Sequence, residues 1–478
     1  MCDVIVIGSG MGSLTAAAML ALKGLQPLIL EQNWIPGGCT TSYPRKGYTF
    51  EAGATTLVGL DDHMPLRYLL DATGIALPSR KLDLPMQVHL TNGQTLSRFQ
   101  DLDRWIAECD QKFGVNSSAF WQEAYTMSKF VWQASTRYLH FPPERTTDYL
   151  RLLKKMRLND VANIPAAWTT TEEVLIRHHL NTPDFRAFID QQLLITAQNT
   201  AEQVNWLFGA AALCYTNYGN YYIDGGLRNL VNPLVEYITS QGGNLQLREP
   251  VVQIEDLGDQ YQVTTKNTTY HSKYLVSGIP LNNLLDHCKF PVRYAPKVMK
   301  SEQLYSAFQM GIAYKPHNQL ESLHHQIHIT NALSGAGSSS IFLSLSHPED
   351  TTRSPDPDTS VASISTHIPN PKHNIISTEE WEQQLLNELA RRDIIRPENI
   401  VYQHSSGPRS WHKWTGRAHG FVGGYPQYKH IKPWQMVGAR LDLKRAYHCG
   451  DTAYPGQGIP GATLSGIIAA TKLTNDWL

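Results

Sequence analysis

The chain has 478 residues, and its 41 Lys and Arg nearly balance its 42 Asp and Glu, which gives a formal net charge of -1. This length exceeds what one hydrophobic core usually supports, so we expect two or three structural units. The balanced charge excludes the basic surface that nucleic-acid binding requires, so no nucleic-acid partner is expected.

The first 31 residues predict a nucleotide-binding unit. The β-branched run over residues 3–7 predicts a strand buried on both faces. Gly8 permits a tight turn out of this strand, and Gly10 leaves room for a phosphate at the N-terminus of the helix that follows over 14–24. A second apolar run ends at Glu31, whose carboxylate can accept a hydrogen bond from a ribose 2′-OH. Strand, glycine turn, helix, strand and acid in this register indicate dinucleotide binding.

Two turns of small residues follow. Gly37 and Gly38 keep the backbone bare, which allows close passage over a bound cofactor, and the alternating segment 47–56 ends in a second turn. Together they indicate a cofactor longer than a nicotinamide site requires, although either turn alone is as typical of an ordinary loop. Residues 84–96 then predict a hairpin that turns at Asn92-Gly93.

Residues 100–215 are mostly helical in pattern, which predicts a helical insertion between parts of the nucleotide-binding domain. The expected helices are Asp101–Phe113, Ser118–Trp132, Tyr149–Leu158, Thr171–His178 and Ala201–Leu213. The third of these is basic and amphipathic, and such a helix can rest on an anionic membrane surface. We favour the alternative, in which it packs on its own domain with a solvated cationic face.

The second half of the chain predicts a return to the nucleotide-binding domain and then a second sheet. The returning part has an expected helix over 227–240 and strands over 244–247, 251–254, 261–265 and 274–277. The second sheet has expected strands over 306–314, 326–330, 340–345 and 360–367, with a helix over 378–391. A strand would place His325 and His328 on opposite faces, so we favour strand packing for the histidines of 324–328 and predict no metal site.

The C-terminal segment carries a second ligand-binding pattern. A strand near Tyr447 delivers Gly450-Asp451, and the glycine-rich stretch 455–462 leads into a helix over 463–477. A strand that brings an acid to a helix N-terminus can bind both anions and hydroxyl groups, and Asp451 can accept from a sugar or ribityl hydroxyl.

The two terminal motifs together are similar to those of the FAD-dependent amine-oxidase and phytoene-desaturase superfamily. Residues 191–198, 222–226, 416–424 and 455–461 resemble most closely the branch of phytoene desaturases, carotenoid isomerases and retinol saturases. The resemblance spans the whole chain. It implies an α/β fold in which a Rossmann-like FAD-binding domain (GR2-type) is combined with a discontinuous second substrate domain of mixed sheet and helices.

The resemblance also implies a division of the chain. Residues 1–96, 221–290 and 406–478 would form the first, second and closing parts of the FAD-binding domain, 97–220 a largely helical substrate segment and 291–405 the substrate-domain sheet. FAD would extend between the N-terminal fingerprint and Asp451.

The residues that the resemblance assigns to FAD are Gly8, Gly10, Met11, Gly12, Ser13, Glu31, Gln32, Gly37, Gly38, Thr40, Gly53, Ala54, Thr55, Val251, Gly450, Asp451, Gly458 and Ile459. Glu31 would hold the adenosine ribose, the backbone of Val251 would reach the adenine, and Ile459 would lie at the isoalloxazine. Two positions depart from the family pattern: Ser13 replaces a third glycine, and Pro36 stands where an arginine commonly flanks the glycine pair.

The implied chemistry is hydride transfer from an apolar polyene or lipid to flavin N5, with a proton lost from the adjacent carbon. The alternatives are an oxidase of an amine or amino acid and a non-catalytic flavin-binding scaffold. Neither the catalytic base nor the electron acceptor is assigned. The candidate bases Gln198, Tyr222, Arg417, His419 and Tyr425 are each more typical of structural positions, and Trp411 and Trp414 suit a channel lining and a domain interface equally.

The cysteine pattern bears on the compartment. Six cysteines are scattered without a C-x-x-C pair, at positions Cys2, Cys39, Cys109, Cys214, Cys288 and Cys449. This spacing indicates reduced thiols and hence a cytoplasmic protein. No leader and no membrane span are expected, because the chain starts at once in a strand and has no long uncharged apolar stretch. Peripheral membrane contact is left as a possibility.

Overall fold

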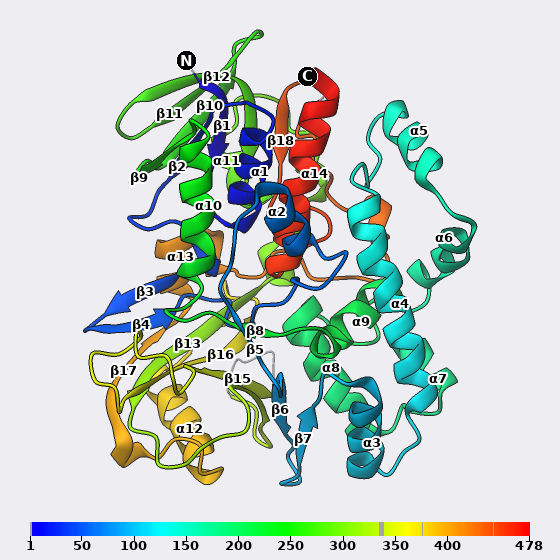
Figure 1. The fold of residues 1–478 in the computed structure, drawn as a ribbon, viewed down its shortest axis with the longest axis vertical. Coiled ribbons are helices and arrows are strands. Elements are labelled where there is room, and N and C mark those ends of the chain that lie inside the picture. Colours follow the sequence, from blue (N-terminus) through cyan, green and yellow to red (C-terminus); the bar gives the residue numbers. More distant parts are fainter. Residues whose placement is uncertain (1, 334–338, 375, 443) are drawn as a thin grey trace.

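The computed structural model describes residues 2–333, 339–374, 376–442 and 444–478 as two sheets with helices around them (Figure 1). The first sheet has the order β10-β11-β12-β1-β2-β9, with β18 paired to β12. Its strands are β1 (Cys2–Ile7), β2 (Pro27–Glu31), β9 (Asn244–Leu247), β10 (Val251–Asp256), β11 (Tyr261–Thr265), β12 (Thr269–Ser277) and β18 (Ala446–His448). β9, β2, β1, β12 and β18 run parallel, so three distant parts of the chain build one nucleotide-binding sheet.

Both faces of this sheet are covered, as the apolar run of β1 predicts. Val4 and Val6 belong to a core shared with α1 (Met11–Ala21), α2 (Pro65–Thr73), α10 (Arg228–Ser240) and α14 (Ile459–Trp477). Ile5 and Ile7 face the opposite core, to which α11 (Leu281–His287) contributes. All eleven residues of α1 are buried, and α14 lies beside it in Figure 1. The absence of a side chain at Gly466 of α14 allows this approach, since a Cβ there would meet the Gly12 carbonyl oxygen at 2.3 Å.

The second sheet has the order β17-β13-β16-β15-β14-β6-β7. Its strands are β6 (Met86–His89), β7 (Thr95–Arg98), β13 (Tyr305–Tyr314), β14 (His324–His328), β15 (Ser340–Leu345), β16 (Ser360–Pro369) and β17 (Ile400–Ser406), and α12 (Thr378–Arg391) packs on it. The expected hairpin is present as β6 and β7, but it joins this sheet through β14 and not the nucleotide-binding sheet. Assigning residues 1–96 wholly to the FAD-binding domain was therefore wrong for the hairpin. Its turn residues specify a hairpin but not which sheet it extends.

The helical segment is formed by α3 (Leu102–Phe113), α4 (Ser118–Arg137), α5 (Thr146–Lys155), α6 (Leu158–Asn163), α7 (Thr171–Arg177), α8 (Pro183–Ala197) and α9 (Trp206–Leu213). α9 begins five residues later than expected, because the Asn205 side chain accepts from the Phe208 N–H and caps the helix there. The expected helix over 149–158 ends at Lys155, and its apolar residues Tyr149, Leu150 and Leu153 are exposed. The favoured interpretation, packing of that helix on its own domain, was wrong for these residues.

Short elements connect these parts. They are β3 (Ser42–Arg45), β4 (Tyr48–Glu51), β5 (Arg80–Lys81), β8 (Tyr221–Tyr222), α13 (Pro408–Thr415) and the 3-10 turns η1 (Gly38–Thr40), η2 (Ile164–Ala167), η3 (Tyr215–Asn217), η4 (Ala295–Lys297), η5 (Ser301–Gln303), η6 (Pro397–Asn399), η7 (Ala418–Gly420) and η8 (Pro433–Gln435). Across the described ranges, no helix combines the length and apolar character needed to cross a membrane. The six cysteines are free thiols.

Three buried histidines of β14 predict acid sensitivity. Burial lowers the pKa of His324 and His328 to about 4 and that of His325 to about 3, against 6.5 for the ordinary side chain. The unfolded chain therefore binds more protons below pH 6.5, so stability should fall as the pH drops from 6.5 toward 4, by on the order of 1 kcal/mol per pH unit for each histidine. Urea unfolding at a series of pH values measures this slope. His328→Phe removes one of the three titrating groups and should reduce the pH slope of stability. The His328 Nε2 is buried without a hydrogen-bond partner, so no hydrogen bond from that atom is lost. An unchanged slope would show that His328 does not contribute to the acid sensitivity.

Candidate flavin site and substrate cavity

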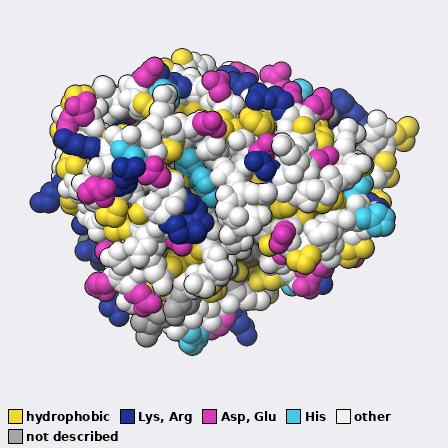
Figure 2. Space-filling model, turned by 90° about the horizontal axis from the view of Figure 1, so that it is seen from below, with side chains coloured by type: hydrophobic (Ala, Val, Ile, Leu, Met, Phe, Trp, Pro, Cys, Tyr) yellow, Lys and Arg dark blue, Asp and Glu magenta, His cyan; other side chains and the backbone are white. Residues whose placement is uncertain are grey.

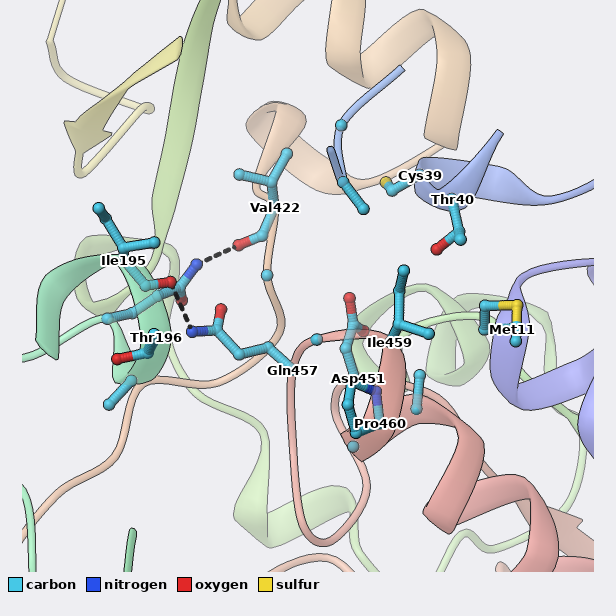
Figure 3. Close-up of a pocket in the computed structure, with 18 of the residues that line it drawn as sticks. Met11, Cys39, Thr40, Ile195, Thr196, Val422, Asp451, Gln457, Ile459 and Pro460 are labelled. Atoms are coloured by element: carbon cyan, nitrogen blue, oxygen red, sulfur yellow. Dashed lines mark hydrogen bonds between the residues drawn. The ribbon is translucent and has the colours of Figure 1, made fainter. Parts of the chain in front are cut away.

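A cavity of about 500 Å³ lies where the two sheets and the helical segment meet. Figure 3 shows Met11, Cys39, Thr40, Asp451 and Ile459 at one end of it. At the other end, Gln457 donates to the Ile195 carbonyl at 3.2 Å, and Val422 and Thr196 lie close by (Figure 3). The cavity thus joins the two sequence motifs that lie at opposite ends of the chain to residues of the helical segment.

The N-terminus of α1 presents unpaired donors to this cavity. Gly8 has φ +82°, which allows the sharp turn after β1, and the Leu14 N–H donates to the Gly10 carbonyl at 2.9 Å. The N–H groups of Met11, Gly12 and Ser13 precede this first helical bond and have no partner within the helix. No side chain caps the helix and no acid lies in its first turn. These donors and the helix dipole form a site for an anion.

Gly10 and Gly12 are glycines for different reasons. Gly10 has an ordinary extended conformation, with φ -66° and ψ 170°, and a Cβ there would meet nothing within 4 Å. The chain itself therefore gives no reason for glycine at position 10, and the open space beside it lies in the cavity. A Cβ on Gly12 would instead lie 2.7 Å from the Gly450 nitrogen. Gly12 is needed for close approach of the two ends of the chain, and Gly10 leaves room for a ligand.

The serine at the third glycine position is accommodated by a glycine that directly follows a neighbouring strand. Ser13 Oγ donates to the Ile7 carbonyl at 3.3 Å, so its hydroxyl points back toward β1 and away from the cavity. A Cβ on Gly278, which directly follows β12, would lie 1.9 Å from Ser13 Oγ. The space that a third glycine would leave at position 13 is thus provided by Gly278, whose missing side chain makes room for the Ser13 hydroxyl.

Glu31 lies at the end of β2 but does not line the cavity. Its Oε2 accepts from the Ser9 N–H at 2.9 Å and from Ser9 Oγ at 2.6 Å, and its Oε1 accepts from the Asn33 N–H at 2.8 Å. A carboxylate has about four acceptor positions, so one remains for a ribose hydroxyl. The Glu249 N–H donates to the Glu31 carbonyl at 2.8 Å. Val251 follows Glu249 by two residues, so it lies on the segment that contacts the end of β2. Gln32 Nε2 donates to the Trp414 carbonyl at 3.1 Å, so that side chain is already engaged.

Arg417 and Asp451 form the charged part of the cavity wall. Arg417 Nη2 donates to Asp451 Oδ2 at 2.7 Å. Burial lowers the pKa of Arg417, but Asp451 and Cys39 more than offset this, so its pKa lies above the ordinary value and the guanidinium is charged. Arg417 Nη1 is buried and has no hydrogen-bond partner. The wall of the cavity that the N-terminus of α1 lines thus also carries a cation with one unpaired donor nitrogen.

The predicted cofactor residues divide into two groups. Those that line the cavity are Gly10, Met11, Gly12, Gly37, Thr40, Gly53, Ala54, Thr55, Gly450, Asp451, Gly458 and Ile459. Gly8, Ser13, Glu31, Gln32, Gly38 and Val251 lie outside it. Two backbone hydrogen bonds hold the small-residue turns at the cavity. The Gly37 N–H donates to the Ser9 carbonyl at 3.0 Å, and the Ala54 N–H donates to the Cys39 carbonyl at 3.0 Å.

The part of the cavity away from the glycines is largely apolar. α4 contributes Trp132, α9 contributes Phe208, and β15 contributes Phe342. Its polar side chains include Gln198, whose Nε2 donates to the Val422 carbonyl at 2.8 Å while its Oε1 is buried without a partner. His367 of β16 also lines this part, and burial lowers the pKa of its imidazole to about 4, so the ring is neutral near pH 7. His367 carries no functional signal in the sequence, because an alternating strand pattern does not show which of its two faces lines a cavity.

The candidate bases predicted from the sequence differ in whether they line the cavity. Arg417 and Gln198 line the cavity, whereas His419 is exposed. Tyr222 donates from its hydroxyl to Asp350 at 2.6 Å, away from the cavity, and Tyr425 donates to Asn282 at 2.6 Å. Of the two tryptophans with undecided roles, Trp411 lines the cavity, and the Trp414 carbonyl accepts from Gln32 and Asn33.

A family model for flavin-containing amine oxidoreductases matches residues 14–474. The chain belongs to this family. It is 25% identical over 516 residues to the chloroplastic prolycopene isomerase of Arabidopsis thaliana, covering 99% of this chain and 83% of that protein. Phytoene desaturase (lycopene-forming) of Pseudescherichia vulneris is 25% identical over 255 residues, which cover 52% of this chain and 49% of that one. The solved structure of putrescine oxidase bound to putrescine has a TM-score of 0.66 at 15% identity over 99% of both chains, a likeness of fold alone.

Membership in this flavin-containing family confirms the expected superfamily, the α/β fold with a Rossmann-like flavin domain and a substrate domain, and FAD as the cofactor. The residues at the cavity fit this group. The first-turn donors of α1, the open space beside Gly10 and the free Nη1 of Arg417 suit a diphosphate, and Asp451 can accept from a hydroxyl. Bound FAD supplies a ring that accepts a hydride.

Proposed function

We propose that this flavin-dependent oxidoreductase is a desaturase or isomerase of a long isoprenoid, carotenoid-like or other apolar lipid. The observation that carries the proposal is the charge of the cavity wall. Among the described residues that line the cavity, the charged side chains are Arg417 and Asp451, and they pair with each other. An ammonium substrate would find no unpaired carboxylate there, whereas an apolar chain would contact aromatic and aliphatic side chains. The named activities of the two relatives support the same substrate class.

In this proposal the two ends of the chain hold the cofactor. The N–H groups that begin α1 and the Nη1 of Arg417 bind the pyrophosphate, Glu31 accepts from the adenosine ribose, and Asp451 accepts from the ribityl chain. Gly37, Gly38, Thr40 and the 53–55 turn pass along the cofactor, while Ile459 at the N-terminus of α14 lies against the ring. The pairing with Asp451 keeps Arg417 in place before the cofactor binds.

The remaining residues of the cavity orient the substrate and exclude water. Trp132, Phe208 and Phe342 provide the apolar contacts that hold a polyene against the flavin. In desaturation one C–H bond loses a hydride and the adjacent carbon loses a proton. The neutral imidazole of His367 offers a nitrogen lone pair for that proton. In isomerisation the substrate loses no hydrogen, and the same residues hold the polyene while one of its double bonds changes geometry.

Anaerobic spectroscopy of the purified holoenzyme tests the proposal. A desaturase predicts that a polyene in detergent bleaches the oxidised flavin and yields a product lighter by one pair of hydrogens. An isomerase predicts geometric conversion without a change of mass when the flavin has first been reduced. Ala212→Phe should narrow the apolar cavity and slow either reaction by about tenfold or more with flavin content unchanged, whereas Ala212→Ser keeps the volume.

Two results would overturn the proposal. Bleaching by amines with formation of peroxide, and none by polyenes, would identify an amine or amino-acid oxidase. A flavoprotein that reacts with neither class, in either redox state of the flavin, would instead be a non-catalytic scaffold.

A further inference from the structure

The segment from α5 to Trp168 carries an unusual run of exposed apolar side chains. Leu158 is 90% exposed and Leu153 is 62% exposed. The other large apolar residues that the segment exposes are Tyr149, Leu150, Met156, Val161, Ile164 and Trp168. α5 and α6 lie at the edge of the molecule, at the upper right of Figure 1. We call residues 149–168 the apolar edge. Exposed apolar side chains in such number indicate a surface that is covered by something else.

The apolar edge is also positively charged. Arg151, Lys154, Lys155 and Arg157 lie among its apolar residues. The acids Asp148, which directly precedes the edge, and Asp160 within it are both buried, so neither offsets this charge at the surface. The face in Figure 2, by contrast, mixes acidic and basic side chains throughout. A surface that combines apolar and basic side chains complements an anionic lipid surface.

Polar anchors, and not apolar packing, hold the two helices in place. The buried residue of α5 is Asp148, which accepts from Arg440 Nη1 at 2.5 Å and from the Glu144 N–H at 2.9 Å. The buried residue of α6 is Asp160, which accepts from Arg137 Nη1 at 3.0 Å. Because these bonds fix the helices at their N-termini, their apolar side chains are free to face outward. The exposure is thus built into the fold.

The far end of the apolar edge leads toward the flavin site. Trp168 packs against Trp434 of η8 with ring centroids 5.0 Å apart, and Lys432 Nζ lies 5.9 Å from the centre of the Trp168 ring. Gln435 and Met436, which follow Trp434, line a second cavity of about 390 Å³. This second cavity and the first have Gln427 and Asp451 as shared lining residues. An apolar molecule bound at the apolar edge would therefore lie next to the second cavity, which adjoins the candidate flavin site.

We propose that the apolar edge, with Trp434 and Lys432, docks the protein on a bilayer that contains anionic lipid. The leucines and tryptophans enter the interface between headgroups and acyl chains, and the lysines and arginines bind the headgroup phosphates. This docking does not depend on the proposed function, because lipid binding is measured without turnover. If the substrate is a lipid, docking would also bring the second cavity close to its source.

Co-sedimentation of the holoenzyme with vesicles tests the docking. Binding is expected to vesicles of phosphatidylcholine with phosphatidylglycerol, to weaken as salt is raised, and to be weaker on phosphatidylcholine alone. Leu153→Glu with Leu158→Glu should reduce binding to anionic vesicles on the order of a hundredfold. Lys154→Glu with Lys155→Glu should reduce it by about tenfold or more on anionic vesicles and leave binding to neutral vesicles unchanged.

Ile176→Glu on α7 is the matched control, since Ile176 is 54% exposed on a helix outside the apolar edge. It should bind vesicles like the unmodified protein, and all variants should keep their flavin absorption and thermal stability. Two results would overturn the proposal. One is equal vesicle binding by the leucine variant and the control. The other is a dimer that the leucine variant dissociates in a protein that does not bind vesicles, which would make the edge an interface between two copies.

Discussion

Gly10→Val is expected to give a folded protein that has lost its FAD. A Cβ at position 10 meets no protein atom within 4 Å, and the extended φ and ψ of Gly10 suit valine. The branched side chain would therefore cost the apoprotein little. It would occupy the space beside the unpaired N–H groups of α1, where a diphosphate must approach. FAD affinity should fall by about one to two orders of magnitude, the usual effect of overfilling a packed site.

The measurement is FAD titration of the apoprotein, with thermal unfolding recorded in the absence of flavin. Gly12→Ala is the matched contrast, because its Cβ would lie 2.7 Å from the Gly450 nitrogen, which is backbone and cannot move aside. It should lower the apoprotein's stability by about 1–3 kcal/mol. If Gly10→Val also destabilises the apoprotein, Gly10→Ala repeats the test with one carbon. Unchanged FAD affinity in both Gly10 variants would remove Gly10 from the cofactor site.

Local signals in the sequence predicted the nucleotide-binding half well. β-Branched runs, a glycine turn and an alanine-rich helix each specify their own conformation, and the strands β9 and β11 have the predicted bounds. The superfamily motif assigned the N-terminal glycines and Gly450-Asp451 to one cofactor, and the structure brings these segments together: β18 pairs with β12, and a Cβ on Gly12 would lie 2.7 Å from the Gly450 nitrogen. Sequence periodicity alone gives no such long-range pairing.

What the sequence could not predict depends on contacts between distant segments. The hairpin of β6 and β7 was predicted, but its partner strand β14 lies more than two hundred residues away and carries no pairing signal. Ser13 was a departure from the pattern until the structure placed Gly278 against it. Arg417 was considered only as a candidate base, and the structure instead pairs it with Asp451 in the cavity wall.

The exposure of α5 could not be predicted for a related reason. An amphipathic helix has the same pattern whether its apolar face meets protein or lipid. The deciding fact is that Asp148, not a leucine, is the residue of α5 that is buried. That fact depends on Arg440, which lies far away in sequence and donates to both Asp148 and Asp476.

Arg440→Met should accordingly destabilise the whole protein. The Arg440 side chain is 1% exposed and contacts three buried carboxylates, those of Glu144, Asp148 and Asp476. Burial raises the pKa of Asp148, but the nearby His140 and the hydrogen bonds from Arg440 overcome this and hold its pKa well below the ordinary range. Removing the guanidinium leaves these charges buried with too few cations, which costs about 3–5 kcal/mol. A typical domain is stable by only about 5–15 kcal/mol, so a large fall in the melting temperature is expected.

Thermal and urea unfolding of the holoenzyme measure this loss, and two further variants assign its cause. Arg293→Met removes a cation that is 36% exposed and lies 3.9 Å from the same Glu144, so it should cost less than about 1 kcal/mol. Adding Asp148→Asn to Arg440→Met should restore part of the stability, because one of the unpaired charges is then gone. If the second change restores nothing, Arg440 acts through its packing and not its charge, and the anchor of α5 is not electrostatic. If it does restore stability, the charge of Arg440, which also pairs with Asp476 of α14, fixes the helix whose leucines face outward.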